Sequence, residues 1–257
     1  MSVGRGRDVN VVELFKPAAS ITGLVIVWYA LAEGGMVGKL PGPVPVALAA
    51  TELVSNPEVH ASLIASLRHI YIPYVLAAAI GVPLGIAIGW NQLFNDLVFP
   101  SLEIFRPVPP IAWLPIVILV FPTTIQGIMF ITFLGAFFPI VLNTIAGVRS
   151  IDENYVRVVQ CLGGSRWQVI REVVVPAALP SIHTGLIVGM GLAWINLVAA
   201  EMIASEGLGR FVWVSYTSST FPNILFSVLV IGALGYASSE VVRLLGNRKL
   251  QWMNQAE

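Results

Sequence analysis

Charged residues are scarce in this chain. Lys, Arg, Asp and Glu make up only 11% of its 257 residues, whereas a soluble globular domain carries roughly 25%. Hydrophobic residues make up 56%, and the mean hydropathy is +0.83. The formal net charge is zero, so the composition gives no sign of nucleic-acid binding. This balance predicts a membrane protein.

Cysteine and histidine are scarce as well. The single cysteine, Cys161, excludes an internal disulfide and any cysteine-based metal site. His60, His69 and His183 are scattered without metal-ligand spacing, so we interpret them as structural or interfacial. The chain also lacks the glycine-rich loop with lysine and serine or threonine that cradles nucleotide phosphates. We therefore predict no catalytic residues, metal or cofactor in this chain, and any energy from ATP must enter through a separate subunit.

Long apolar segments fill most of the sequence. A membrane-spanning helix needs about 20 largely apolar residues, and six windows meet that condition. No segment has the composition of a separate soluble domain, so we predict one all-α membrane domain over residues 1–257, with its first span retained. Six helices form a small bundle, and we expect two copies to associate. The windows lie near 17–36, 68–90, 97–121, 125–147, 179–204 and 222–245.

The basic residues predict the orientation of these spans, because cytoplasmic loops are enriched in Lys and Arg. With the N-terminus inside, only Lys39 and Arg210 fall on the outer side. Both termini and the loop over about 149–176 are therefore predicted to be cytoplasmic. The basic residues on the cytoplasmic side are Arg5, Arg7, Lys16, Arg149, Arg157, Arg166, Arg171, Arg243, Arg248 and Lys249.

The loop at 149–176 has the pattern of two short helices. Ser150 to Glu153 fits a capping box, which predicts a helix start, and Gly163-Gly164 predicts its end. Ser165 and Gln168 form a second start, and Pro176 should end that second helix. The first helix carries an apolar stripe at helical spacing, which favours either docking to a groove on a soluble partner or binding to lipid head groups. The stripe consists of Tyr155, Val158, Val159 and Leu162.

The same loop resembles the signature loop of bacterial ABC importer permeases. That signature has a Glu-Ala-Ala triplet, a glycine and a later proline; Gly163 and Pro176 match its spacing, and the run "LGGSRWQVIREVVVPAALP" is similar to the family's. Arg157-Val158-Val159 stands where the triplet is usual. The stretches "EIFRPVPPIAWLPIVILVF", "FFPIVLNTIAGV" and "AEMIASEGLG" resemble the subfamily that imports nitrate, bicarbonate, taurine and aliphatic sulfonates. Pro122-Thr123 departs from this pattern, because a glycine commonly follows the aromatic residue.

The resemblance implies a type I ABC importer permease fold in a bacterial inner membrane. It also implies a second copy of the permease, two ATP-binding cassette subunits that bind ATP and Mg, and an external solute-binding protein. The apolar stripe would then contact the ATPase, Gly163 would fix the exit of the helix, and Arg166 would be available to acidic groups on the partner.

Ionisable groups at membrane depth are costly and are therefore candidates for the translocation pathway. Glu103 and Arg106 lie three residues apart and either pair along one helix face or leave Arg106 facing the pathway. Pro107, Pro109 and Pro110 deny backbone hydrogen bonds, so they predict a break in the third span at this point.

The fifth span contains two further polar candidates, Asn196 and Glu201. Glu201 is expected near the outer end, as a gate residue or a receptor-side residue. Gly185, Gly189 and Gly191 favour close helix packing, within the bundle or across a dimer.

A self-sufficient channel or ion-coupled carrier is the alternative function. It would use Glu103, Arg106 and Glu201 as a charge relay. This alternative leaves the amphipathic cytoplasmic helix without a role, and it predicts that a flexible linker could replace the loop.

Overall fold

The computed structural model describes residues 11–34 and 38–249, with side-chain surroundings given for 19–34 and 38–246. This part of the chain forms helices and turns without a strand, which confirms the predicted all-α class. Arg5 and Arg7, two of the predicted cytoplasmic residues, lie outside it. The helices are α1 (Val11–Glu33), α2 (Pro43–Leu53), α3 (Pro57–Trp90), α4 (Gln92–Phe105), η1 (Pro110–Trp113), α5 (Leu114–Val120), α6 (Thr124–Arg149), α7 (Glu153–Cys161), α8 (Arg166–Val169), the π-turn η2 (Ile170–Val174), α9 (Val175–Glu201), α10 (Leu208–Thr217) and α11 (Phe221–Lys249).

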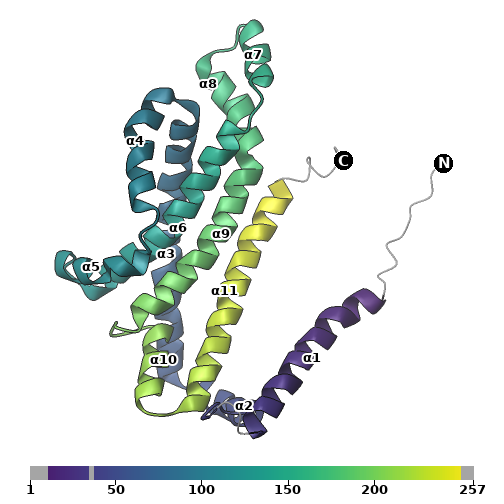
Figure 1. Cartoon of the computed structure of the whole chain (residues 1–257), viewed down its shortest axis with the longest axis vertical. Helices are drawn as coiled ribbons and strands as arrows, with labels where there is room; N and C mark the ends of the chain where they lie inside the picture. The colour runs from purple at the N-terminus through teal and green to yellow at the C-terminus, as the bar shows by residue number, and fades with distance from the viewer. Residues whose placement is uncertain (1–10, 35–37, 250–257) are drawn as a thin grey trace.

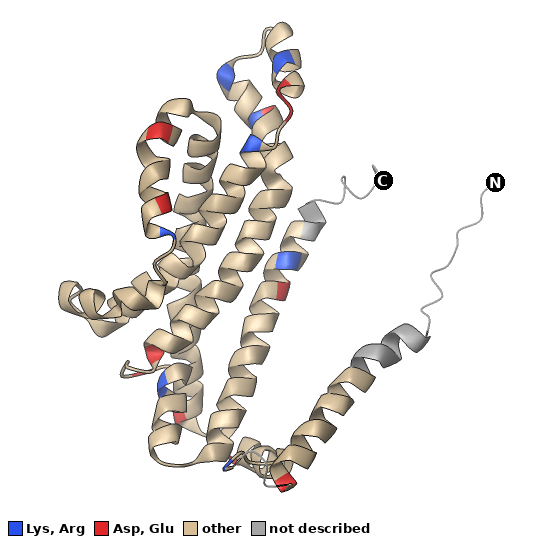
Figure 2. Ribbon diagram, in the orientation of Figure 1, with Lys and Arg blue, Asp and Glu red and all other residues tan. Residues whose placement is uncertain are grey.

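Helices α3, α6, α9 and α11 form a bundle along the long axis of the molecule, in which α3 and α6 run parallel and α9 runs antiparallel to α6 (Figure 1). The turn of α7 and α8 lies at one end, α2 and α10 lie at the other, and α1 leaves the bundle beside α2. Figure 2 shows charged residues gathered at the α7–α8 end, while α6 and α9 are uncharged over most of their length.

Four helical stretches in the described part of the chain are long and apolar enough to cross a membrane. A fifth span arises if α4 and the η1–α5 segment count together, although they meet at a bend of 84°. The predicted break at Arg106 is therefore confirmed. The predicted count of six is not confirmed, since the searched part of α1, Ala19–Glu33, is shorter than a span. The four are Pro57–Trp90, Thr124–Arg149, Arg166–Glu201 and Phe221–Gly246.

Small residues bring α3 and α9 into close contact with α6. Gly81, Gly85 and Gly89 recur every four residues on α3, so they share one face of that helix. A Cβ atom at Gly85 would lie 2.6 Å from Thr144 Cβ of α6. On α9, a Cβ at Gly185 would lie 2.8 Å from Asn143 Cβ. Helix α6 is thus the centre of the bundle, and apolar side chains such as Ile140 fill the space around it.

Candidate functional site

Helix α7 stands outside the bundle and begins at Glu153. Asp152 caps it, because its Oδ1 accepts a hydrogen bond of 2.8 Å from the Asn154 backbone N–H. The predicted capping box at Ser150 is wrong: the Ser150 hydroxyl donates to the Gly147 carbonyl at the end of α6. Both side chains are good caps, and Ser150 is used to close the preceding helix.

A glycine in the left-handed region ends α7, as predicted. Gly163 has φ of +82°, and its N–H donates to the Gln160 carbonyl at 3.0 Å. The Gly164 N–H donates to the Val159 carbonyl at 2.9 Å. These two bonds form a Schellman motif, which fixes the direction in which the chain leaves the helix.

The apolar stripe of α7 divides into two faces. Val159 is partly buried and packs with Val156 against the cluster that contains Val148. Trp167 on α8 is a further exposed side chain of the loop, which sequence reasoning missed because it followed the periodicity of one helix only. The exposed apolar side chains of the loop, called the α7 surface below, are Tyr155 (66% exposed), Val158 (58%), Leu162 (83%) and Trp167 (69%).

The second helix of the loop starts as predicted. Ser165 and Gln168 form a reciprocal capping box, and Arg166 is exposed on its first turn. The predicted end at Pro176 is wrong, because α8 continues through the π-turn η2 into α9. A π-turn already departs from the usual hydrogen-bond ladder, so a proline beside it, without an N–H, is tolerated.

Glu103 and Arg106 are both exposed beside the break of the third span. Of the ion pairs formed by the described residues, none joins these two side chains. The Arg106 backbone N–H still donates to the Leu102 carbonyl, and the Val108 N–H donates to the Phe105 carbonyl, so the helix ends in a tight turn that contains Pro107.

Glu201 is fully buried at the end of α9 opposite the α7 surface. Its carboxylate lies 2.8 Å from the Ser66 hydroxyl and 3.0 Å from His69 Nδ1, both on α3. It also accepts a hydrogen bond of 3.0 Å from the Gly209 N–H of α10. The Ser66 hydroxyl and the Gly209 N–H donate to this buried side chain, which satisfies its polar atoms, and the network holds α3, α9 and α10 together.

A glycine makes room for this carboxylate. Gly207 has φ of +106°, and a Cβ there would overlap the Glu201 side chain. The Ser66 hydroxyl also accepts the Leu208 backbone N–H at 2.8 Å. Sequence reasoning singled out Glu201 but missed Ser66, which lies 135 residues away in the chain.

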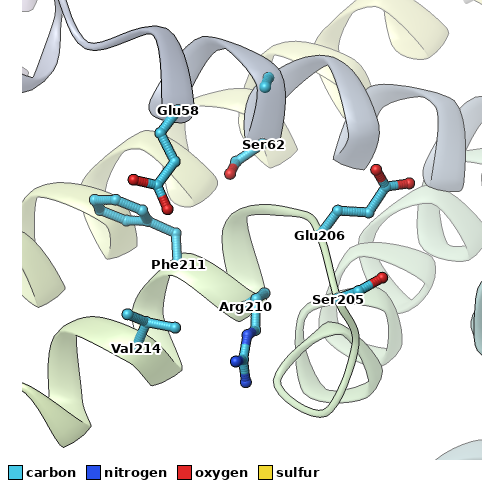
Figure 3. A pocket seen from close by; sticks show the side chains of 8 residues that line it. Glu58, Ser62, Ser205, Glu206, Arg210, Phe211 and Val214 are labelled. Carbon is cyan, nitrogen blue, oxygen red and sulfur yellow. The ribbon is translucent and has the colours of Figure 1, made fainter.

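A cavity of about 360 Å³ lies beside this network at the α10 end of the bundle. Figure 3 shows Glu58 and Ser62 of α3 on one wall, with Glu206 of the α9–α10 loop and Arg210 of α10 around it. Glu206 also lies 3.4 Å from His69 Nε2, so it joins the cavity to the buried network.

Asn196 is partly buried where α9 meets α6. Its Nδ2 donates to the Leu192 carbonyl of the same helix at 2.8 Å, and it lies against Gly135 of α6. Gly185 and Gly189 likewise face α6 within one copy of the chain, whereas the described surroundings of Gly191 leave open space. Of the three glycines, only Gly191 is thus free for contact with another molecule.

A family of transport proteins matches residues 81–248, over half of the chain; it is described as the binding-protein-dependent transport system inner membrane component. The chain belongs to this family. It is a transport subunit that passes the membrane several times, and ATP hydrolysis lies in separate subunits.

Curated relatives extend the match beyond the family region. The chain is 33% identical over 243 residues to the nitrate import permease of Synechocystis sp., covering 91% of this chain and 88% of the relative. It is 33% identical over 252 residues to the bicarbonate transport system permease of Synechococcus elongatus, covering 93% and 87%.

A solved structure of the MetNI methionine ABC transporter in an inward-facing conformation shares the fold. The TM-score is 0.61 at 18% identity, covering 73% of this chain and 92% of that one. This likeness supports the type I importer permease fold predicted from the sequence.

Proposed function

We propose that this chain forms the pathway for a small oxyanion, such as nitrate or bicarbonate, or for a sulfonate. The names of the nitrate and bicarbonate permeases among its relatives support this substrate class. Arg106 is exposed at the broken span without a described acidic partner, which suits a passing anion. A role in the pathway for Glu103, Asn196 or Glu201 stays a prediction.

The assembly that we propose has two copies of this chain and two ATP-binding cassette subunits, which bind ATP and Mg²⁺. An external solute-binding protein delivers the solute at the end that carries Arg210, and both termini face the cytoplasm of a bacterial inner membrane. The α7 surface carries this proposal, since four large apolar side chains are exposed on α7, its C-cap and the following helix α8, outside the bundle.

ATP-driven closure of the two cassettes would draw the two α7 surfaces together. Helices packed as closely as α6 and α9 move as bodies, so this displacement would rock the bundles between inward-open and outward-open states. The two states must bind the closed cassettes with different free energies for ATP to drive the change.

Reconstitution tests this function. Liposomes holding the chain, its cassette subunit and the external receptor are assayed for uptake of nitrate, bicarbonate and taurine, with and without ATP. We expect ATP-dependent uptake of one of these solutes that requires all three proteins. Equal uptake by the chain alone would support the channel or carrier instead, and ATP-dependent uptake of none of the three solutes would overturn the proposed substrate class.

A further inference from the structure

Arg149 joins two elements that lie far apart in the sequence. It is the last residue of α6, and its side chain reaches across to α4. The guanidinium carbon lies 4.7 Å from the centre of the Phe99 ring, and Nη2 donates a hydrogen bond to Asn95 Oδ1. A cation over an aromatic face is attracted by the ring electrons. The Phe99 ring and the Asn95 side chain therefore fix the position of the same guanidinium group.

These contacts sit where the loop that carries the α7 surface meets the bundle. Helix α7 starts at Glu153, four positions after Arg149. A displacement of α7 therefore reaches the end of α6 through only three intervening residues, as it reaches α9 through α8. The arginine is exposed to solvent, while Phe99 and Asn95 are partly buried.

Helix α4 links this point to the broken span. Its side chains Val98, Phe99 and Leu102 pack on a cluster that includes Ile88 of α3 and Val141 of α6. At its other end, α4 runs into the 84° bend at residues 106–109. Helix α4, which contains Pro100, thus connects the Arg149 contact with the segment that carries Arg106.

We propose that Arg149 is a positioning residue that transmits the displacement of the α7 loop to α4 and hence to the broken span. The inference rests on the proposed function, since it presumes that a partner moves α7. Arginine suits the position because its planar guanidinium can stack on the Phe99 ring and at the same time donate a hydrogen bond in the plane to Asn95. A lysine ammonium lacks this planar geometry.

Amide hydrogen exchange on the assembled complex tests this proposal without knowledge of the solute. Exchange is compared between the nucleotide-free complex and the complex trapped with ATP and vanadate, in peptides covering 92–112 and 150–165. In the natural chain, both peptides should change on trapping. In Arg149→Ala, the change in 92–112 should fall by at least about threefold while that in 150–165 persists.

A matched control is Arg243→Ala, which removes an arginine from α11 that pairs with Glu240 of the same helix. It should keep both responses. If Arg149→Ala fails to assemble, Arg149→Lys decides the question by the same comparison, with a partial loss expected in 92–112.

A 92–112 response in the Arg149 variants equal to that of Arg243→Ala would overturn the proposal. The failure of the proposed function looks different, because peptide 150–165 of the natural chain would then not respond to ATP.

Discussion

Leu162 is the most exposed residue of the α7 surface, so a charge there tests docking at the scale of one residue. If the α7 surface docks in a groove of the ATPase that excludes water, Leu162→Asp would bury a carboxylate there without a partner. We expect recovery of the tagged ATPase with the solubilised permease to weaken about a hundredfold or more. The membrane bundle should be unaffected, because this side chain lies outside it.

The control for this change is Gln160→Asp, which adds the same charge on an exposed position of α7 away from the stripe. It should leave recovery near normal. Recovery of Leu162→Asp at the control level, with normal stimulated ATP hydrolysis, would show that the α7 surface faces lipid.

Gly163 tests the exit from α7. Within the described residues, a Cβ at this position meets no atom within 4 Å, so Gly163→Ala adds only the strain of φ at +82°. That strain costs about 1–2 kcal/mol. Because this strain destabilises the end of α7, we expect the amide hydrogens of residues 153–164 to exchange faster in the isolated permease than in the natural chain. Gly191→Ala, at a helical glycine with equally open surroundings, should not accelerate it.

At the scale of elements, Ser66 connects α3 to both α9 and α10. Ser66→Ala would leave the buried Leu208 N–H without its acceptor and remove one donor from Glu201. We expect the free energy of unfolding to fall by about 1–3 kcal/mol, seen as a lower midpoint of thermal unfolding in detergent.

Ser227→Ala is the matched control for that prediction. Ser227 is equally buried, but its hydroxyl donates to the Asn223 carbonyl of its own helix. Its loss should change the midpoint little. Similar shifts in the two variants would mean that the Glu201 network does not stabilise the contact between α3 and the α9–α10 loop.

Local chemistry made much of the α7 loop predictable. The spacing of apolar residues predicted the stripe of the first helix, and Gly163-Gly164 predicted where that helix ends. The start was misplaced because Ser150 and Asp152 are both good caps, and only the surrounding structure shows that Ser150 serves α6. Continuity through Pro176 was missed because a π-turn leaves no clear mark in the sequence.

The Glu201 network was not predictable in the same way. Its partners Ser66 and His69 come from another helix, and helical periodicity says nothing about which faces of two distant helices meet. The inward turn of Val159 has the same cause, since it depends on the position of Val148 and its neighbours.

At the scale of the whole molecule, the proposed function makes the loop indispensable. Replacing residues 152–164 by a flexible Gly/Ser linker should preserve membrane insertion, because no spanning helix is altered. It should abolish both ATPase recovery and ATP-driven uptake in reconstituted liposomes. Undiminished uptake by the linker variant would favour the self-sufficient channel or carrier.

The unbroken run from Arg166 to Glu201 has a mechanical consequence. It spans 36 residues, which at 1.5 Å per residue makes a lever arm of about 54 Å. A tilt of only about 5° at the end where we propose that the ATPase docks would swing the opposite tip by about 5 Å. That tip holds Glu201, whose carboxylate is pinned to α3 and α10. A small displacement on the α8 side would therefore move the wall of the cavity that Glu206 and Arg210 line.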